Sequence, residues 1–437
     1  MKKTKSIITV VLIALIGYGW FAEISGFISG NKKANELAQA GVEYTDKKLY
    51  QKAIEAFTES LTYKENPEVR DGLIEAYELG FGDNVVSKSE LKKALETAAT
   101  IDSKNSVYWE KLIELCIDTA DYSNAYTYCK EAMNAGSKSN LLNELIDTVS
   151  YSFSKKSKMY RDVYYCPDGY MTLFDGEDYG AMSVSGEWLY KCDYDFVSPI
   201  GQDHSLLVVT PTDKRIVDEK NVVQAYITDS FDAVKAIGND ILPMQKNGSW
   251  IFYDYSKNKA VGEKYENVTS FQNKKAFAYK NNKWVQVDID GEKQDVEFED
   301  IKLYTNGEYS YKSIMVAAKD GMYSVYDRNG KSKTEFTAKD MDNYYGGLIA
   351  YQDNNGKWGY INKKGEVVIE ASYENAKSFS NNLGAVCVDD KWGFINEDGK
   401  LVIENQFLDV GYFTANGRNL VSSSESEFYE IERRIKG

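Results

Sequence analysis

One stretch of this chain is written twice in close succession. Residues 357–370 read Lys-Trp-Gly-Tyr-Ile-Asn-Lys-Lys-Gly-Glu-Val-Val-Ile-Glu, and residues 391–404 read Lys-Trp-Gly-Phe-Ile-Asn-Glu-Asp-Gly-Lys-Leu-Val-Ile-Glu. The copies start 34 residues apart, and a fixed period of this length is typical of repeat architectures. Each copy predicts a β-hairpin, because an aromatic-led strand and a β-branched strand flank a turn that holds Gly365 or Gly399.

The repeat extends towards the N-terminus in a weaker form. Its pattern is an aromatic anchor, a glycine at +7, an aromatic residue at +15 and an apolar residue at +21. Seven units follow from it, with anchors at Tyr179, Ile216, Trp250, Trp284, Tyr323, Trp358 and Trp392. The spacings between these anchors are 37, 34, 34, 39, 35 and 34 residues. A further apolar run ends each unit, so a unit carries three clear strands and has room for a short fourth.

The motif Lys-Trp-Gly-Tyr/Phe-Ile-Asn-x-x-Gly-x-Val/Leu-Val-Ile resembles that of the bacterial WG-repeat (KWG-repeat) family. The resemblance covers roughly residues 160–437 and decays towards the N-terminal units, where Trp and the following Gly are often lost. Units of this length with three or four strands suit propeller blades. We therefore expect an all-β domain over 160–437, a seven-bladed β-propeller, with a linear β-solenoid as the alternative.

Two strand-like segments lie outside the seven units. They are Tyr170–Phe174 before the first anchor and Phe428–Ile431 after the last unit. Pairing them would leave no bare sheet edge, so we expect these two segments to close a ring.

Residues 31–155 have a different character, rich in Ala, Leu and charged residues at helical spacing. Two sets of residues lie at the spacings of a tetratricopeptide (TPR) repeat: Leu37, Ala40, Gly41, Tyr44, Ala53 and Phe57, and then Trp109, Leu112, Cys116, Ala125, Cys129 and Ala132. This region resembles TPR domains. We expect about three helical hairpins, with the middle one stretched by a loop at 80–84, and a capping helix over Leu141–Phe153. Residues 155–158, Lys-Lys-Ser-Lys, read as a polar linker or a solvated helix end.

The N-terminus carries lysines at positions 2, 3 and 5 before an apolar run over residues 7–22. Basic residues before such a run predict insertion with the lysines on the cytoplasmic side. We expect residues 1–30 to form a basic tip and a single transmembrane anchor, with the bulk of the chain outside the cytoplasm. Gly17-Tyr-Gly19 is a poor cleavage site, and secretion after signal cleavage is the alternative.

The net charge of the chain limits the kinds of partner that it can bind. The 437-residue chain has a net charge of −15 and a pI of about 4.9, which disfavours binding to nucleic acid. Tyrosine occurs 34 times, and tyrosine both fills β-rich cores and serves carbohydrate- and protein-binding surfaces.

Few residues here suggest chemistry. His204 is the single histidine, so neither a His-rich zinc site nor a catalytic relay is expected. The five cysteines, Cys116, Cys129, Cys166, Cys192 and Cys387, form no CxxC pair. Cys116 and Cys129 would face each other in one hairpin, as buried thiols or as a disulfide. Asp288-Ile-Asp-Gly-Glu292 has a hint of a calcium loop but falls on a hairpin turn, where turn chemistry explains it.

The anchor tryptophans recur once per unit and are replaced by Tyr or Ile in other units. That behaviour indicates a packing position between repeats rather than an exposed binding platform. We therefore predict no catalytic, cofactor-binding or metal-binding residues. We expect a non-catalytic, membrane-anchored scaffold that binds a protein or peptide, with a carbohydrate- or cell-wall-binding module as the alternative.

Overall fold

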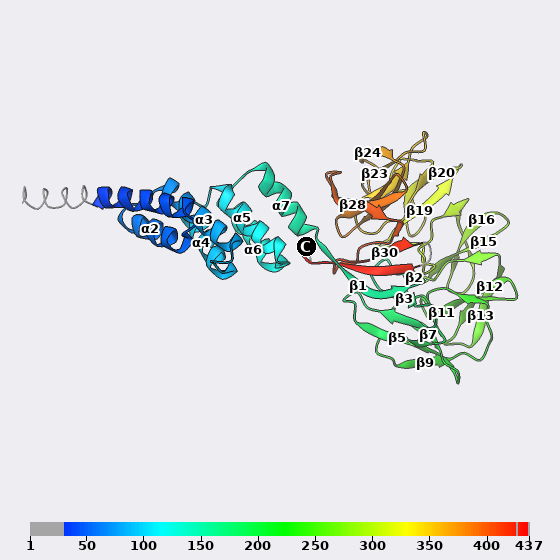
Figure 1. Cartoon of the computed structure of the whole chain (residues 1–437). Helices are drawn as coiled ribbons and strands as arrows, with labels where there is room; N and C mark the ends of the chain where they lie inside the picture. The colour runs from blue at the N-terminus through cyan, green and yellow to red at the C-terminus, as the bar shows by residue number, and fades with distance from the viewer. Residues whose placement is uncertain (1–29, 425–426, 436–437) are drawn as a thin grey trace, which may run out of the picture. The chain divides into compact units, whose positions relative to one another are not determined.

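The computed structural model describes residues 30–424 and 427–435 and divides the chain into two compact units, Met1–Val149 and Ser150–Gly437 (Figure 1). Among the residues it describes, no helix is long and apolar enough to cross a membrane. The expected anchor falls on residues 1–29, which lie outside the described residues.

The described part of the first unit, from residue 30 on, is a row of seven helices. The first covers residues 30–46, and the others are α2 (Tyr50–Tyr63), α3 (Pro67–Gly82), α4 (Lys88–Ile101), α5 (Ser106–Asp118), α6 (Tyr122–Ala135) and α7 (Asn140–Ser150). They form three hairpins followed by one further helix, as the TPR-like spacing predicts. The loop expected at 80–84 starts later than predicted, because α3 continues through Gly80, which packs against Val86 and Tyr50.

Small residues allow the helices of this unit to approach closely. A β-carbon at Gly41 or Gly72 would lie only 2.6 or 2.9 Å from the ring of Phe57, so only glycine fits at these positions. Cys116 and Cys129 are buried free thiols of α5 and α6. Burial raises the pKa of Cys129 to about 12.

The described residues of the second unit form eight antiparallel sheets. We call each sheet a blade and name it by its strands. The first four blades in chain order are β2 (Asp162–Tyr165), β3 (Met171–Phe174), β4 (Tyr179–Met182) and β5 (Trp188–Tyr194); β6 (Phe196–Val197), β7 (Leu206–Val209), β8 (Lys214–Val217) and β9 (Val223–Tyr226); β10 (Ala233–Val234), β11 (Ile241–Lys246), β12 (Ser249–Asp254) and β13 (Lys259–Tyr265); and β14 (Asn267–Val268), β15 (Lys275–Lys280), β16 (Lys283–Asp288) and β17 (Lys293–Phe298).

Three blades follow, and the two ends of the unit build the eighth. The three are β18 (Asp300–Ile301), β19 (Ile314–Lys319) and β20 (Met322–Asp327); β21 (Asp340–Met341), β22 (Ile349–Gln352), β23 (Trp358–Ile361) and β24 (Val367–Tyr373); and β25 (Asn375–Ser380), β26 (Leu383–Val388), β27 (Lys391–Ile395) and β28 (Leu401–Phe407). The eighth holds β29 (Asp409–Val410), β30 (Arg418–Ser424), β31 (Glu427–Arg433) and β1 (Phe153–Tyr160), in the order β1-β31-β30-β29.

The expected blade number, seven, was therefore wrong, and the fold is an eight-bladed β-propeller. Each anchor marks the third strand of a blade, and the eighth blade has β31 at that position with no anchor of the repeat pattern. The sequence suggested two spare closing strands, Tyr170–Phe174 and Phe428–Ile431. In the structure these segments fall in β3 and β31, and both strands belong to complete blades. Ring closure itself excludes the linear β-solenoid.

The closing pair also differs from the expected one. Phe428 pairs with Tyr160 and Ile431 with Lys155, both in β1, whereas β3 pairs with β2 and β4 (Figure 1). Residues 155–158 are thus part of a strand and not a linker. Their exposed lysines look like a linker in sequence because β1 is the outermost strand of its blade.

The recurring positions of the repeat motif each have a structural role in a blade. Trp250, Trp284 and Trp392 are buried in the cores of their blades, and Trp358 packs partly buried against its own. The motif asparagine closes the following turn: Asn362 Oδ1 accepts from the backbone N–H groups of Lys364 at 2.9 Å and Glu366 at 3.2 Å. Gly365 takes a φ of 85° in that turn. The burial of three of the four anchor tryptophans agrees with a packing role, which stays a prediction for the partly buried Trp358.

Candidate axial site

One connection of the propeller is much longer than its neighbours. Residues 302–313 join β18 to β19 with twelve residues, whereas six residues join β10 to β11 and β14 to β15. We call residues 302–313 the plug segment. It accounts for the 39-residue spacing between Trp284 and Tyr323.

The plug segment crosses to four other blades. The carbonyl of Asn306 accepts from the Ala236 N–H at 2.9 Å, and that of Gly307 accepts from the Ser270 N–H at 2.8 Å. The Asn306 side chain donates to the carbonyl of Ile200 at 3.0 Å. The hydroxyl of Thr305 accepts from the Tyr165 N–H at 2.7 Å. The segment therefore binds the inner ends of blades β2–β5, β6–β9, β10–β13 and β14–β17.

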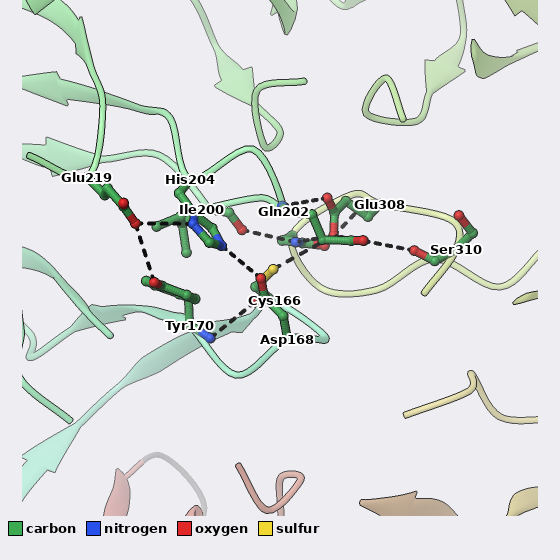
Figure 2. Close-up of polar contacts among 10 residues, drawn as sticks. Cys166, Asp168, Tyr170, Ile200, Gln202, His204, Glu219, Glu308 and Ser310 are labelled. Atoms are coloured by element: carbon green, nitrogen blue, oxygen red, sulfur yellow. Dashed lines mark hydrogen bonds and ion pairs between the residues drawn. The ribbon is translucent and has the colours of Figure 1, made fainter. Parts of the chain in front are cut away.

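Glu308 is the centre of the plug segment's polar contacts (Figure 2). Its side chain is buried and accepts hydrogen bonds from the backbone N–H of Gln202 at 2.8 Å, the Gln202 amide at 3.0 Å and the Asn306 amide at 3.0 Å. The thiol of Cys166 lies 3.8 Å from it. Burial raises the pKa of Glu308, and the donors from Gln202 and Asn306 oppose that rise. These neutral donors satisfy the carboxyl group structurally.

His204 lies beside this network (Figure 2). Its Nε2 is 2.9 Å from Asp168 Oδ2, its Nδ1 is 3.2 Å from Glu219 Oε2, and its ring packs against that of Tyr170 at a tilt, with centroids 4.1 Å apart. The hydrogen bond with Asp168 is the main cause that raises the pKa of His204. The histidine thus ties the connection after β2 to the turn after β8.

Two cavities lie along the axis beside the plug segment, whose two ends contribute to their walls. The loop-side cavity, about 240 Å³, is lined by the connections that hold Asp168, Lys312, Gly346, Asn382 and Thr414. The strand-side cavity, about 360 Å³, is lined by the first strands of the blades and their ends, including Asp162, Thr305, Asn343, Lys377 and Asp409.

Three tyrosines line both cavities: Tyr165, Tyr345 and Tyr412. The rings of Tyr345 and Tyr412 stack with centroids 3.5 Å apart, and Tyr165 meets Tyr412 edge-on at 6.2 Å. The hydroxyl of Tyr412 donates to Asp342 at 2.8 Å, and the Ser378 N–H donates to the same oxygen at 2.7 Å. Burial raises the pKa of Asp342. We call these three residues the tyrosine layer.

The other residues singled out in the sequence lie apart from the axis or serve turns. Asp288 accepts from the N–H groups of Asp290 at 3.1 Å and Glu292 at 2.9 Å, the same turn geometry as Asn362. No group of three or more metal-ligating side chains occurs within residues 30–424 and 427–435. All five cysteines are buried free thiols, and only Cys166 reaches the axial network among those described here.

Sequence reasoning missed the axial residues. Glu308, Gln202 and Tyr412 carry no local motif, since each is a single polar or aromatic residue in a connection. The one usable signal was the 39-residue spacing, which is five residues longer than the period of the clearest repeats. Extra length inside one unit of a regular repeat indicates a segment with its own role.

The comparisons agree with this architecture. The family model described as "WG containing repeat" matches residues 358–392 and 392–421. Among curated proteins, none matches this chain.

Three solved structures are similar to parts of the chain. The TPR domain of Sgt2 from Aspergillus fumigatus is 23% identical over 27% of this chain and 76% of that chain, with a TM-score of 0.22. PorZ, a surface component of the type-IX secretion system of Porphyromonas gingivalis, is 10% identical over 66% of this chain and 38% of its own, with a TM-score of 0.32. The Pan2 WD40 domain of Neurospora crassa is 8% identical over 64% of this chain and 90% of its own, with a TM-score of 0.33.

At TM-scores this low, these likenesses carry no argument about function. The family match stands on the sequence motif at residues 358–421. The chain is a repeat protein that carries WG-containing repeats at residues 358–421, within a propeller that follows helical hairpins with TPR-like spacing.

Proposed function

We propose that this protein is a non-catalytic scaffold that binds a protein partner through its helical unit and is held at the outer face of the membrane by its N-terminal apolar segment. The observation that carries the proposal is a groove of about 370 Å³ between α2, α3 and α4. Apolar side chains dominate its lining: Leu61, Leu73, Ile74, Tyr77, Ala94, Ala98 and Ile101.

Several of these side chains remain accessible. Leu61, Leu73 and Tyr77 are half-buried, and Ile101 is 53% exposed. Accessible apolar side chains in a groove between helices suit the apolar face of a partner helix or peptide. Arg70, Glu90 and Lys93 also line the groove and supply polar contacts for such a segment.

The axial carboxyl groups support a non-catalytic role. Glu308 is engaged by Gln202 and Asn306, and Asp342 by Tyr412 and Ser378. A general acid or base must exchange a proton with a substrate. These two carboxyl groups instead hold the plug segment and the tyrosine layer in place.

The membrane location rests on the sequence of the N-terminus. Lysines at positions 2, 3 and 5 precede the apolar run over residues 7–22, which favours a cytoplasmic N-terminus and an exported chain. A phosphatase fused after residue 437 would be active only outside the cytoplasm. An inactive fusion, with a cytoplasmic reporter active at the same point, would overturn this location.

Binding of a partner in the groove can be tested with a probe at Ile101, which lines it. A photo-crosslinker placed there in the full chain, in its native cells, should capture a protein that one at Val107 does not. Val107 is a matched control because it is also an exposed β-branched residue, 45% exposed, and does not line the groove. The purified partner should bind Ile101→Glu at least ten times more weakly than Val107→Glu. Equal capture at both positions, or equal binding by both variants, would contradict the proposal.

A further inference from the structure

The plug segment makes the propeller axis asymmetric. It fills the side next to blades β6–β9, β10–β13 and β14–β17, where Asn306 and Gly307 are bound. The two cavities lie between the two ends of the plug segment and blades β2–β5, β21–β24, β25–β28 and the eighth blade. The tyrosine layer forms a wall common to both cavities.

The loop-side cavity is lined mainly by neutral polar groups. Asn381, Asn382, Ser380 and Thr414 contribute amides and hydroxyls. Its two charged residues are one acid and one base. Asp168 is held by His204, and the Lys312 ammonium lies over the ring of Tyr311, 5.1 Å from its centroid. A ligand with a net charge finds no excess of opposite charge there.

Three buried polar atoms of residues that line the cavities make no hydrogen bond within the part of the chain that the structure describes. They are Tyr165 Oη, Asn343 Oδ1 and Asn381 Nδ2. Tyr165 and Asn343 are both more than nine-tenths buried. Buried polar groups are normally satisfied. Asn381 lines the loop-side cavity, Asn343 the strand-side cavity and Tyr165 both, so each cavity has polar atoms that a polar ligand can satisfy.

The hydrogen-bonding needs of these three atoms limit the chemical class of ligand that fits the cavities. The Asn343 oxygen needs a donor, the Asn381 nitrogen needs an acceptor, and the Tyr165 hydroxyl can act as either. A hydroxyl group can donate to the one and accept from the other, and a sugar ring carries several hydroxyl groups beside an apolar C–H face. We propose that the axial cavities bind a neutral polyhydroxylated ligand, namely a sugar residue of a glycan, with its apolar C–H face against the tyrosine layer. This site goes beyond the protein-binding function of the helical groove and does not depend on it.

The test uses the purified full chain in a detergent without a sugar head group, because a glycoside detergent would compete. Isothermal titration is made with two soluble probes, a tetramer of β-1,4-linked N-acetylglucosamine and a tetramer of α-1,4-linked glucose. The site predicts that at least one tetramer binds with a stoichiometry of one per chain.

The site is located with matched double variants. Asn381 and Asn382 form a two-residue hairpin turn with φ of 48° and 62°, and Asn281 and Asn282 form one with φ of 55° and 63°. Glycine accepts these φ values, so both turns survive substitution. Asn381→Gly with Asn382→Gly should weaken binding at least tenfold, whereas Asn281→Gly with Asn282→Gly should leave it unchanged. No binding of either tetramer, or equal binding by both double variants, would overturn the assignment.

Discussion

Lys235 lies over the ring of Trp250, with its ammonium nitrogen 4.8 Å from the ring centroid. The same ammonium donates to Asn267 Oδ1 at 2.8 Å and to the carbonyl of Val268 at 2.5 Å, both in the first strand of the next blade. The lysine therefore connects the anchor of one blade to the neighbouring blade. We call this arrangement the lysine clamp.

The lysine clamp recurs twice with a charged partner. Lys377 lies over Trp392 and donates to Asp409 at 2.8 Å, and Lys302 lies over Tyr323 and pairs with Asp340 at 2.7 Å. In each case the partner belongs to the first strand of the next blade. In these three blades the aromatic anchor both packs in its blade and carries the lysine that reaches the next blade.

The neutral clamp predicts a stabilising substitution. Desolvation lowers the pKa of Lys235 to about 8, because the amide of Asn267 does not offset the buried charge. Since this pKa lies below the ordinary value of 10.5, the unfolded chain binds more protons between about pH 8 and 10.5, and stability should rise with pH over that window. Asn267→Asp should add about 1–2 kcal/mol at pH 7 and flatten the rise.

Urea unfolding at pH 7 and pH 9.5 checks this, with Asn247→Asp as the control. Asn247 is exposed in a hairpin turn, so its substitution makes the same charge change away from any clamp. An Asn267→Asp variant no more stable than Asn247→Asp at pH 7 would contradict the clamp's role.

The different burial of the anchor tryptophans predicts that their substitution by alanine lowers the free energy of unfolding by different amounts. Trp392→Ala should destabilise the propeller by about 3–5 kcal/mol, since the ring is buried and truncation leaves a cavity. Trp358→Ala should cost less, because Trp358 is only partly buried. Chemical denaturation of both variants measures the difference. If Trp392→Ala melted like the parent protein and lost a ligand, the ring would be a binding surface instead.

The closing strand can be trapped covalently. Ser154 and Glu432 are paired neighbours in β1 and β31, so Ser154→Cys with Glu432→Cys should form a disulfide readily under mild oxidation. Phe174→Cys with Glu432→Cys, which tests the pairing suggested by the sequence, should not link. Non-reducing electrophoresis after proteolysis distinguishes them. Linking of the second pair alone would mean that β1 does not close the ring.

His204 predicts a pH-dependent contribution to stability. Asp168 and Glu219 raise the pKa of His204 in the folded protein. The protonated imidazole therefore stabilises the fold in full below the unfolded-state pKa of about 6.5, and this stabilisation is lost as pH rises through the pKa of the folded protein. His204→Gln should therefore lower the melting temperature more at pH 5.5 than at pH 8.5. Because His204 is the single histidine, its ring resonances give the folded pKa directly by NMR. A folded pKa below 6.5 would contradict this.

The proposed anchor predicts an uncleaved N-terminus. Mass spectrometry of the mature protein from membranes should find the residues of the apolar run still attached. A mature N-terminus between residues 18 and 32 would show a cleaved signal peptide instead.

Sequence reasoning was strongest where the period is regular. The two clear copies from Trp358 and Trp392 predicted strands and turns, because these depend on residues close together in sequence, as Asn362 and Gly365 show in their turn. The helical hairpins followed from small residues such as Gly41, which must admit Phe57. The eighth blade could not be counted, since it combines residues from both ends of the propeller.

The axial site lay beyond sequence reasoning for a related reason. Tyr165, Tyr345 and Tyr412 come from three blades and meet only when the ring is closed. Glu308 meets Gln202 across 106 positions of the chain, and neither residue has a partner nearby in sequence that reveals the contact. Spacing along the chain predicts which residues are neighbours within a repeat. It does not predict which residues from different blades meet at the axis.

The closing blade also sets an order of events during synthesis. Ser154 and Glu432 lie 278 positions apart, yet they belong to adjacent strands of one sheet. A ribosome makes β1 before any other strand of the propeller and β31 after all of them, so β1 must wait, unpaired on that edge, while the remaining blades are translated. A transcript broken before codon 427 yields a product with two exposed β-edges, which proteases and chaperones can distinguish from the finished ring.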